Sequence, residues 1–290
     1  MKANTMLETI RSLLGMPACA IPLSVCKPAR SYLLTKADIP VTGTAILFTM
    51  PYVMTADTQD PQRNLSLYAI PRDYHGYITE LSETLIPRLT EAFPAHRFAL
   101  FSDHSPIDEV DAAARAGLGV LGVNGLLITP EYGSFVFIGE VVTDANYTTV
   151  TGADVPSFAD TVPLCEECGA CVAACPIGKA AKDRTMCLSA LTQKKGALSE
   201  EEACLIHDGG LVWGCDACQL ACPHNHQVIR AGKDTPIPYF REERLKQLDA
   251  SIIDNMSDHM LATRAYAWRG RAVIRRNIEL FEIDTERRNS

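Results

Sequence analysis

The sequence lacks any uninterrupted apolar run of the roughly 18 to 20 residues that a membrane-spanning helix needs. Its N-terminal stretch SLLGMPACAIPLSVC is a poor export signal, because Pro17 and Pro22 interrupt it and the positively charged start is weak. We therefore expect no membrane segment and no export signal.

Positive charge is also scarce. The chain has 27 Lys and Arg residues against 35 Asp and Glu residues, which gives a formal net charge of -8. Nonspecific binding to RNA or DNA depends on cationic surface, so this balance argues against a large polynucleotide footprint. The best local exception is RAYAWRGRAVIRRN, residues 264–277, which we interpret as a solvated helix face.

The eleven cysteines do not form an even, spread-out set. Nine of them lie between Cys165 and Cys222. A small secreted protein distributes an even number of cysteines among disulfides, whereas clustered cysteines in a longer chain indicate metal binding. Because exposed metal clusters need reducing surroundings, we expect a cytoplasmic protein.

The chain has 290 residues, of which 47% are apolar, and this is enough for one large core or two modest ones. Residues 1–150 read as mixed α/β, with strands expected at 43–53 and 96–103, helices at 75–93 and 105–117, and a β-hairpin made by 124–129 and 135–143. A linker rich in Thr, Ala, Asp and Pro, residues 144–163, precedes the cysteines. We predict an α+β protein with a cofactor-binding domain at 1–150, a cysteine-rich domain at 151–232 and an extended segment and helical tail at 233–290.

The first cysteine run, CEECGACVAACP, has the spacing C-x2-C-x2-C-x3-C-P, and a second run, GCDACQLACPHN, follows. Zinc usually takes two separated pairs of ligands, whereas three cysteines at this spacing hold three corners of an iron–sulfur cube. In two-cluster ferredoxins the fourth cysteine of such a run ligates the other cluster. The pattern therefore predicts a bacterial-type domain with two [4Fe-4S] clusters.

This logic divides the ligands between the clusters. Cluster one takes Cys165, Cys168, Cys171 and Cys222. Cluster two takes Cys175, Cys215 and Cys218 and needs one more ligand, for which Cys187 and Cys204 are the candidates. We prefer Cys187, twelve residues after Cys175, and interpret Cys204 as an ordinary buried thiol on an amphipathic helix.

The stretch AGLGVLGVNG contains Gly117, Gly119 and Gly122 in G-x-G-x-x-G spacing. A dinucleotide site needs a strand before this motif and a helix after it, and here the expected order is the reverse. The glycines therefore let the backbone approach another flat cofactor or make a turn.

Several segments together resemble epoxyqueuosine reductase: DYH, SDHSPIDE, RAGLGVLGVNGLLITPEYGSFVFIGEVVT, MCLSALTQKKG and GCDACQLACPHN. The resemblance covers roughly residues 68–225, and more weakly WRGRAVIRRN. It implies a nitroreductase-like α/β domain that binds cobalamin, beside a two-cluster ferredoxin domain, in an enzyme related to reductive dehalogenases. It implies that electrons from a reduced ferredoxin or flavodoxin-type donor pass through the clusters to cobalt, which reduces the epoxide of epoxyqueuosine in tRNA. It also supports Cys187 as the extra cluster ligand.

The resemblance also implies site residues. Asp103, in SDHSP, matches the acid that protonates the substrate as the C–O bond opens. A general acid must keep its proton near neutral pH through burial or a nearby carboxylate, and Asp108 and Glu109 are close in sequence. The alternative role for Asp103 is a helix N-cap. The residues that match the cofactor pocket are Tyr74, His75, Gly117, Gly119, Gly122, Asn124 and Ser134; no histidine, His75 and His104 included, is assigned to cobalt.

The chain departs from the family in three respects. The family usually has lysine where this sequence has Val123, and its N-terminal substrate-side segment is not recognisable here. The chain ends at Ser290, about where the C-terminal helical repeats that contact tRNA begin in longer members, so we expect a short form. Two other functions stay open: a non-catalytic two-cluster electron carrier, and a flavin-dependent reductase paralogue with a small-molecule substrate.

Overall fold

The apolar run at 43–53 forms the centre of a four-stranded antiparallel sheet. The computed structural model describes residues 4–158, 161–166, 168–178 and 187–288, and side chains of the last helix as far as residue 282. Strand β2 (Thr44–Pro51) is buried along its whole length, and β1 (Ala18–Pro22) and β6 (Val136–Thr143) flank it. The strand order is β1-β2-β6-β3, with β3 (Phe98–Phe101) at the other edge.

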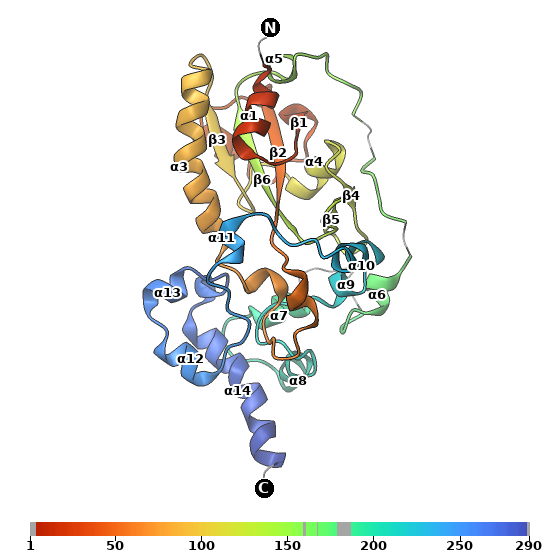
Figure 1. Cartoon of the computed structure of the whole chain (residues 1–290), viewed down its shortest axis with the longest axis vertical. Coiled ribbons are helices and arrows are strands. Elements are labelled where there is room, and N and C mark those ends of the chain that lie inside the picture. Colours follow the sequence, from red (N-terminus) through yellow and green to blue (C-terminus); the bar gives the residue numbers. More distant parts are fainter. Residues whose placement is uncertain (1–3, 159–160, 167, 179–186, 289–290) are drawn as a thin grey trace. The chain divides into compact units, whose positions relative to one another are not determined.

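The chain divides into two compact units. The first comprises Met1–Pro51 and His75–Glu167, and the second comprises Tyr52–Tyr74 and Cys168–Ser290. These units group residues 52–74 with the C-terminal half, unlike the three consecutive segments expected from composition, whose boundaries stay a prediction. The result is an α+β protein, as predicted, with its sheet in the first unit and helices in the second (Figure 1).

Helices surround the sheet of the first unit. They are α1 (Met6–Leu14), η1 (Leu23–Val25), α2 (Tyr32–Lys36), α3 (Tyr74–Ala92), α4 (Glu109–Arg115) and α5 (Tyr147–Thr151). Helix α4 packs on β1, β2 and β6, where its alanines join a core with Leu47 and Val142. Helix α3 confirms the helix expected at 75–93, and its buried residues are Leu85 and Leu89. Helix α5 lies within the segment that was expected to be a linker.

The predicted hairpin of 124–129 with 135–143 is wrong. Strand β5 (Leu127–Ile128) pairs with β4 (Val120–Leu121), whereas β6 pairs with β2 over eight residues and with β3 over four. The bridge between Thr129 and Gly133 lies in the turn that joins the two segments and does not pair them. Strand β6 instead enters the sheet between β2 and β3, where its residues from Gly139 to Thr143 are buried.

The second unit is built from short helices and turns. They are η2 (Thr55–Gln59), η3 (Leu67–Ala69), α6 (Ala170–Ala173), α7 (Leu188–Thr192), α8 (Glu200–Asp208), α9 (Ala217–Leu220), α10 (Pro223–Arg230), α11 (Pro238–Arg241), α12 (Ala250–Asn255), α13 (Asp258–Ala262), η5 (Ala267–Arg269) and α14 (Arg271–Arg288). The helical tail expected after residue 233 is confirmed. Among the described residues, none of the helices combines the length and the hydropathy needed to cross a membrane.

Backbone hydrogen bonds explain why residues 52–74 belong to the second unit. The Ser66 N–H donates to Trp213 O (2.9 Å), and the Val212 N–H donates to Asn64 O (2.8 Å). The Asp73 N–H donates to Thr263 O (2.8 Å). Backbone groups removed from water need such partners, so this segment is held by residues far along the chain.

Gly139 tests the packing of the central strand pair. A Cβ at this position would lie 2.4 Å from the Phe48 ring, directly across the β2–β6 ladder. We expect Gly139→Ala to lower the free energy of unfolding by about 1–3 kcal/mol, because the ring has to shift within a closed core. Chemical denaturation measures this. In a protein that already carries Phe48→Leu, Gly139→Ala should lower the free energy of unfolding by less, because the ring is gone. If the two substitutions lower it by strictly additive amounts, the proposed collision is contradicted.

Candidate functional site

The cysteines predicted for cluster two lie together in the second unit. Cys187 caps α7, Cys215 precedes α9, and Cys218 lies within α9. Burial raises the pKa of the Cys215 thiol to about 12, and the neighbouring Cys187 and Cys218 thiols add to the increase. Cys187 and Cys218 thus influence Cys215 electrostatically, as neighbours of one cluster would, although two helices, α7 and α8, separate Cys187 from Cys215 in the sequence.

Cys204 differs from its expected environment. It lies on α8 and is exposed, so the prediction of a buried thiol is wrong. The short helix α8 turns this position outward, while Ile206 two residues later is fully buried. The structure thus agrees with Cys187 as the better candidate, and the assignment of the eight cluster ligands stays a prediction.

The cysteines predicted for cluster one come from both units of the chain. Cys222 is buried at the N-cap of α10, and Cys171 lies on α6, which packs against α9. Cys165 belongs to the first unit, where its N–H donates to Leu121 O (3.0 Å). All eleven cysteines lie among the described residues and all are free thiols, in agreement with metal binding rather than disulfides.

A buried ion pair fixes the loop between Cys215 and Cys218. Asp216 pairs with Arg63, and both of its oxygens accept the Leu67 N–H (3.1 and 3.0 Å). Burial raises the pKa of Asp216, while the Arg63 guanidinium acts against the increase. Sequence reasoning missed this pair; the signal was an acidic residue between two cysteine ligands. It fixes Asp216, and with it the backbone between Cys215 and Cys218.

Asp103 occupies a constrained loop after β3. Its φ of 61° is left-handed, a conformation that Asp tolerates better than most residues. Its N–H donates to both Glu109 oxygens (2.8 and 2.9 Å), and its carbonyl accepts from Arg30 (3.2 Å). The side chain is exposed, and Asp108, not Asp103, is the N-cap of α4. The alternative role of Asp103 as a helix cap is therefore wrong.

Two carboxyl groups that are largely removed from water lie near this loop. Burial, and next the charge of Glu140, raises the pKa of Glu109 to about 9. Burial raises the pKa of Glu140 on β6 to about 8. The sequence suggested that Glu109 could help Asp103, but it indicated no role for Glu140, whose signal was a single acid in an apolar strand. Glu109 and Glu140, whose raised pKa values favour the neutral form, thus both contact the loop that carries Asp103.

The glycine loop serves mainly its own hairpin. A Cβ on Gly119 would lie 2.3 Å from Ile128 O, and one on Gly122 would lie 2.5 Å from the Asn124 side chain. Asn124 is buried and its side-chain oxygen accepts the Leu126 N–H (3.3 Å). The turn interpretation therefore accounts for these residues. Gly117 is different, because its φ of 91° demands glycine while a Cβ there would meet no atom within 4 Å.

The other expected cofactor residues come from different parts of the chain. His75 is exposed and opens the second stretch of the first unit, and Ser134 is buried beside the β5–β6 turn. Tyr74 is half-buried and belongs to the second unit. His104 lies 2.9 Å through its Nε2 from the Tyr32 hydroxyl. Cofactor binding by Tyr74, His75, Gly117, Gly119, Gly122, Asn124 and Ser134 stays a prediction.

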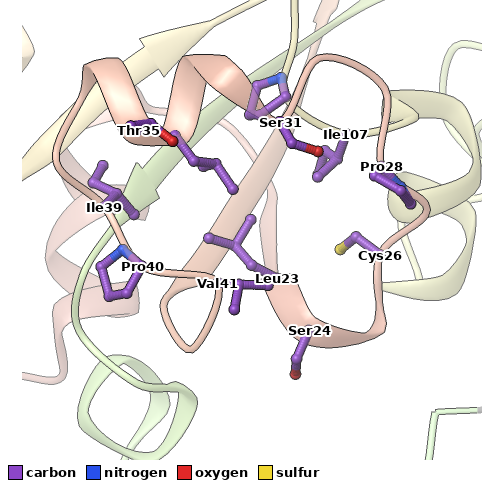
Figure 2. A pocket seen from close by; sticks show the side chains of 12 residues that line it. Leu23, Ser24, Cys26, Pro28, Ser31, Thr35, Ile39, Pro40, Val41 and Ile107 are labelled. Carbon is purple, nitrogen blue, oxygen red and sulfur yellow. The ribbon is translucent and has the colours of Figure 1, made fainter.

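A cavity of about 520 Å³ lies in the first unit next to the Asp103 loop (Figure 2). Its lining is mostly apolar and comprises Leu23, Ser24, Cys26, Pro28, Ser31, Leu34, Thr35, Ile39, Pro40, Val41, Pro106 and Ile107. Figure 2 shows Pro28 and Ile107 at one end and Ile39 and Pro40 at the other. Pro106 and Ile107 belong to the loop, so the loop forms part of the cavity wall.

The choice between Cys187 and Cys204 can be tested by iron content. We expect Cys187→Ala to lose one cluster and retain about half of the iron of the reconstituted wild type, because the other cluster keeps its ligands. Cys204→Ala is the matched control and should retain all of it. Iron analysis and electron paramagnetic resonance (EPR) of anaerobically purified protein measure this, and the opposite pattern would transfer the ligand role to Cys204.

The two raised carboxyl pKa values predict how stability depends on pH. Between the ordinary pKa of glutamate and the raised pKa of about 9 for Glu109, the folded state binds more protons than the unfolded state. The free energy of unfolding should therefore fall as pH rises through this window, by at most about 1.4 kcal/mol per unit of pKa difference. Denaturation from pH 5 to 9 should show this slope reduced in Glu109→Gln and unchanged in the exposed control Glu91→Gln.

Comparison with known proteins agrees with this site. A family model described as a 4Fe-4S double cluster binding domain matches residues 164–225. The epoxyqueuosine reductase of Listeria monocytogenes is 35% identical over 211 residues, which are 71% of this chain and 53% of that protein. The chain spans about half the length of the curated relatives it matches.

Solved structures show the same fold. The epoxyqueuosine reductase of Streptococcus thermophilus matches with a TM-score of 0.71 and 20% identity, over 98% of this chain and 81% of that one. An epoxyqueuosine reductase crystallised with an epoxyqueuosine-modified tRNA-Tyr stem loop matches with a TM-score of 0.69 and 22% identity, over 95% of this chain and 79% of that one. The chain is thus similar to epoxyqueuosine reductases in sequence and in fold, and it contains a 4Fe-4S double cluster binding domain.

Proposed function

We propose that the protein is an iron–sulfur reductase that removes the oxygen of an epoxide, with epoxyqueuosine in tRNA as its substrate. The observation that carries this proposal is the combination, in one chain, of a double cluster binding domain and an exposed acid, Asp103, held in a constrained loop. The clusters supply electrons one at a time, and the acid supplies a proton to the oxygen that leaves.

The balance of the reaction defines what each part must do. Conversion of an epoxide to an alkene breaks two C–O bonds and consumes two electrons and two protons, and the oxygen leaves as water. A reduced ferredoxin or flavodoxin-type protein is the proposed source of the electrons. Asp103 can reach a substrate because its side chain is exposed, while its backbone is fixed by Glu109 and Arg30. A proton donor that is held in a fixed position transfers its proton faster to a correctly placed substrate.

Cobalamin is the proposed second cofactor, on the basis of the similarity to epoxyqueuosine reductases. When bound, a corrinoid would supply a low-valent metal that accepts electrons one at a time and passes two electrons to the substrate. The residues proposed to hold it are Tyr74, His75, Gly117, Asn124 and Ser134. Gly117 suits a close cofactor, because its backbone is exposed and has open space beside it. Atoms of the β4–β5 hairpin already occupy the space beside Gly119 and Gly122, so we propose that these two glycines shape the hairpin and do not contact the cofactor.

tRNA is the proposed partner because a relative of the same fold is described in complex with a modified tRNA stem loop. One observation favours a small-molecule epoxide instead. Arg264 is buried and donates to Glu243 O, and Arg276 donates to Lys194 O and Gly196 O (both 2.7 Å). These arginines of 264–277 are engaged within the second unit, so this segment offers less free positive charge than its sequence suggested.

The first test adds cob(II)alamin to anaerobically purified, reduced protein and follows the EPR spectrum. Cluster signals together with a shifted cobalt signal are the expected result. An unchanged cobalt spectrum would oppose cobalamin and favour an electron carrier or a flavin enzyme, and bound yellow flavin after gentle purification would identify the latter.

The second test concerns Asp103. We expect Asp103→Asn to lower turnover of epoxyqueuosine-containing tRNA by about 10²–10⁴-fold, because the amide cannot supply the proton. Cluster content should stay unchanged. Asp108→Asn is the matched control: it changes an exposed neighbouring acid that caps α4 and should retain turnover within a few fold. Wild-type turnover by Asp103→Asn would remove Asp103 from the mechanism, and turnover of a small epoxide but not of tRNA would identify the smaller substrate.

A further inference from the structure

A glutamate lies at the centre of the sheet of the first unit. Glu140 is on β6, directly opposite Leu47 of β2 on one side and Phe101 of β3 on the other. It is fully buried, and its Oε2 has no hydrogen-bond partner among the described residues. A carboxylate in such a place would leave a buried charge unsatisfied, which is costly.

The charged neighbours offer no compensation. The cations of this region, Lys27 and Arg115, both pair with Asp111 on α4. The other titratable groups near Glu140 are Glu109 on α4 and the half-buried thiol of Cys26, and neither is a cation that could balance a carboxylate. The strands on either side contribute only apolar residues opposite it. The surroundings of Glu140 therefore favour its neutral form.

Hydrogen-bond geometry leads to the same result independently. The Ser105 hydroxyl oxygen lies 2.6 Å from Glu140 Oε1 and 2.8 Å from Ile107 O, and it accepts the Ile107 N–H (3.0 Å). A hydroxyl has a single hydrogen to donate. Because the Ile107 carbonyl can only accept, both contacts are hydrogen bonds only when the serine donates to the carbonyl and the glutamate donates to the serine.

This bond connects the sheet to the loop that carries Asp103. Ser102 Oγ donates to Ile138 O (2.5 Å), two residues from Glu140 on the same strand. The loop is thus attached to β6 on both sides of Asp103, through Ser102 and Ser105. Between these attachments the backbone of Asp103 is left-handed, with φ of 61°. Such a conformation persists only when the surrounding contacts hold it.

We propose that Glu140 is a neutral, proton-donating side chain that positions the Asp103 loop: its O–H donates to Ser105 Oγ, and the Ser105 O–H donates to Ile107 O. Glu140 does not touch substrate in this proposal, so it is a positioning residue. Its catalytic meaning rests on the proposed role of Asp103, whereas its protonation and its hold on the loop do not. Ionisation would reverse the bond, because Ser105 would then donate to Glu140 and release Ile107 O.

Infrared spectroscopy of the intact protein tests the protonation state. At neutral pH we expect carbonyl absorption from a protonated carboxyl group, and Glu140→Gln should remove part of it. Glu109→Gln should remove a different part, because burial also raises the pKa of that carboxyl group. A spectrum of Glu140→Gln that matches wild type in this region would overturn the proposal.

Amide hydrogen exchange of the 102–109 segment tests the hold on the loop. Glu140→Gln keeps an N–H donor for Ser105 and should keep the wild-type exchange rate. Ser105→Ala removes the bond from both sides without disturbing the strand, and should raise the exchange rate of this segment about tenfold or more. Thr44→Ala, which removes a buried side-chain bond of β2 to Ala145 O, is the matched control and should leave the segment unchanged.

Turnover then separates this inference from the proposed function. Ser105→Ala should lower kcat by about tenfold, whereas Glu140→Gln, which keeps a donor for Ser105, should stay near wild type. Unchanged loop exchange in Ser105→Ala would overturn the positioning role, whatever the activity. Full activity in Asp103→Asn would instead refute the proposed acid and leave the infrared and exchange results valid.

Discussion

The antiparallel pairing of β2 with β6 is the interaction on which the first unit depends. It runs over eight residues of each strand and places Gly139 against the Phe48 ring, so the two strands approach closely. The same strand, β6, supplies Ile138 and Glu140 to the loop after β3. A shift of β6 by one residue would move these groups to the opposite face of the sheet. Core packing and placement of Asp103 are therefore set by one register.

The second unit holds most of the cysteines that are predicted to ligate the clusters, and it positions them with many short helices and turns. Residues 52–74 contribute by pairing with residues near 212 and 263, far along the chain. Arg63 and Asp216 then connect this segment to the loop between Cys215 and Cys218. Contacts behind metal ligands orient them and tune the metal, and here those contacts come from a segment with no cysteine of its own.

The acid chemistry of the Asp103 loop depends on placement more than on sequence proximity. Asp108 and Glu109 are neighbours in the sequence, yet one caps α4 and the other holds the Asp103 N–H. Glu140 is 37 residues after Asp103 and is nevertheless attached to the same loop through Ser105. Burial raises the pKa of both Glu109 and Glu140, which favours the neutral forms of the two groups that contact this loop.

Signals carried by neighbouring residues can be interpreted from the amino-acid sequence alone. The spacing of the cysteine runs predicted a double cluster domain, and the apolar run at 43–53 predicted a central strand. The folded chain was needed to show which strand pairs with β6, which unit contains residues 52–74, that Cys204 is exposed, and that Glu140 contacts the Asp103 loop. These features depend on contacts between residues distant in the chain, and hydrophobic periodicity gives the buried face of an element without naming its partner.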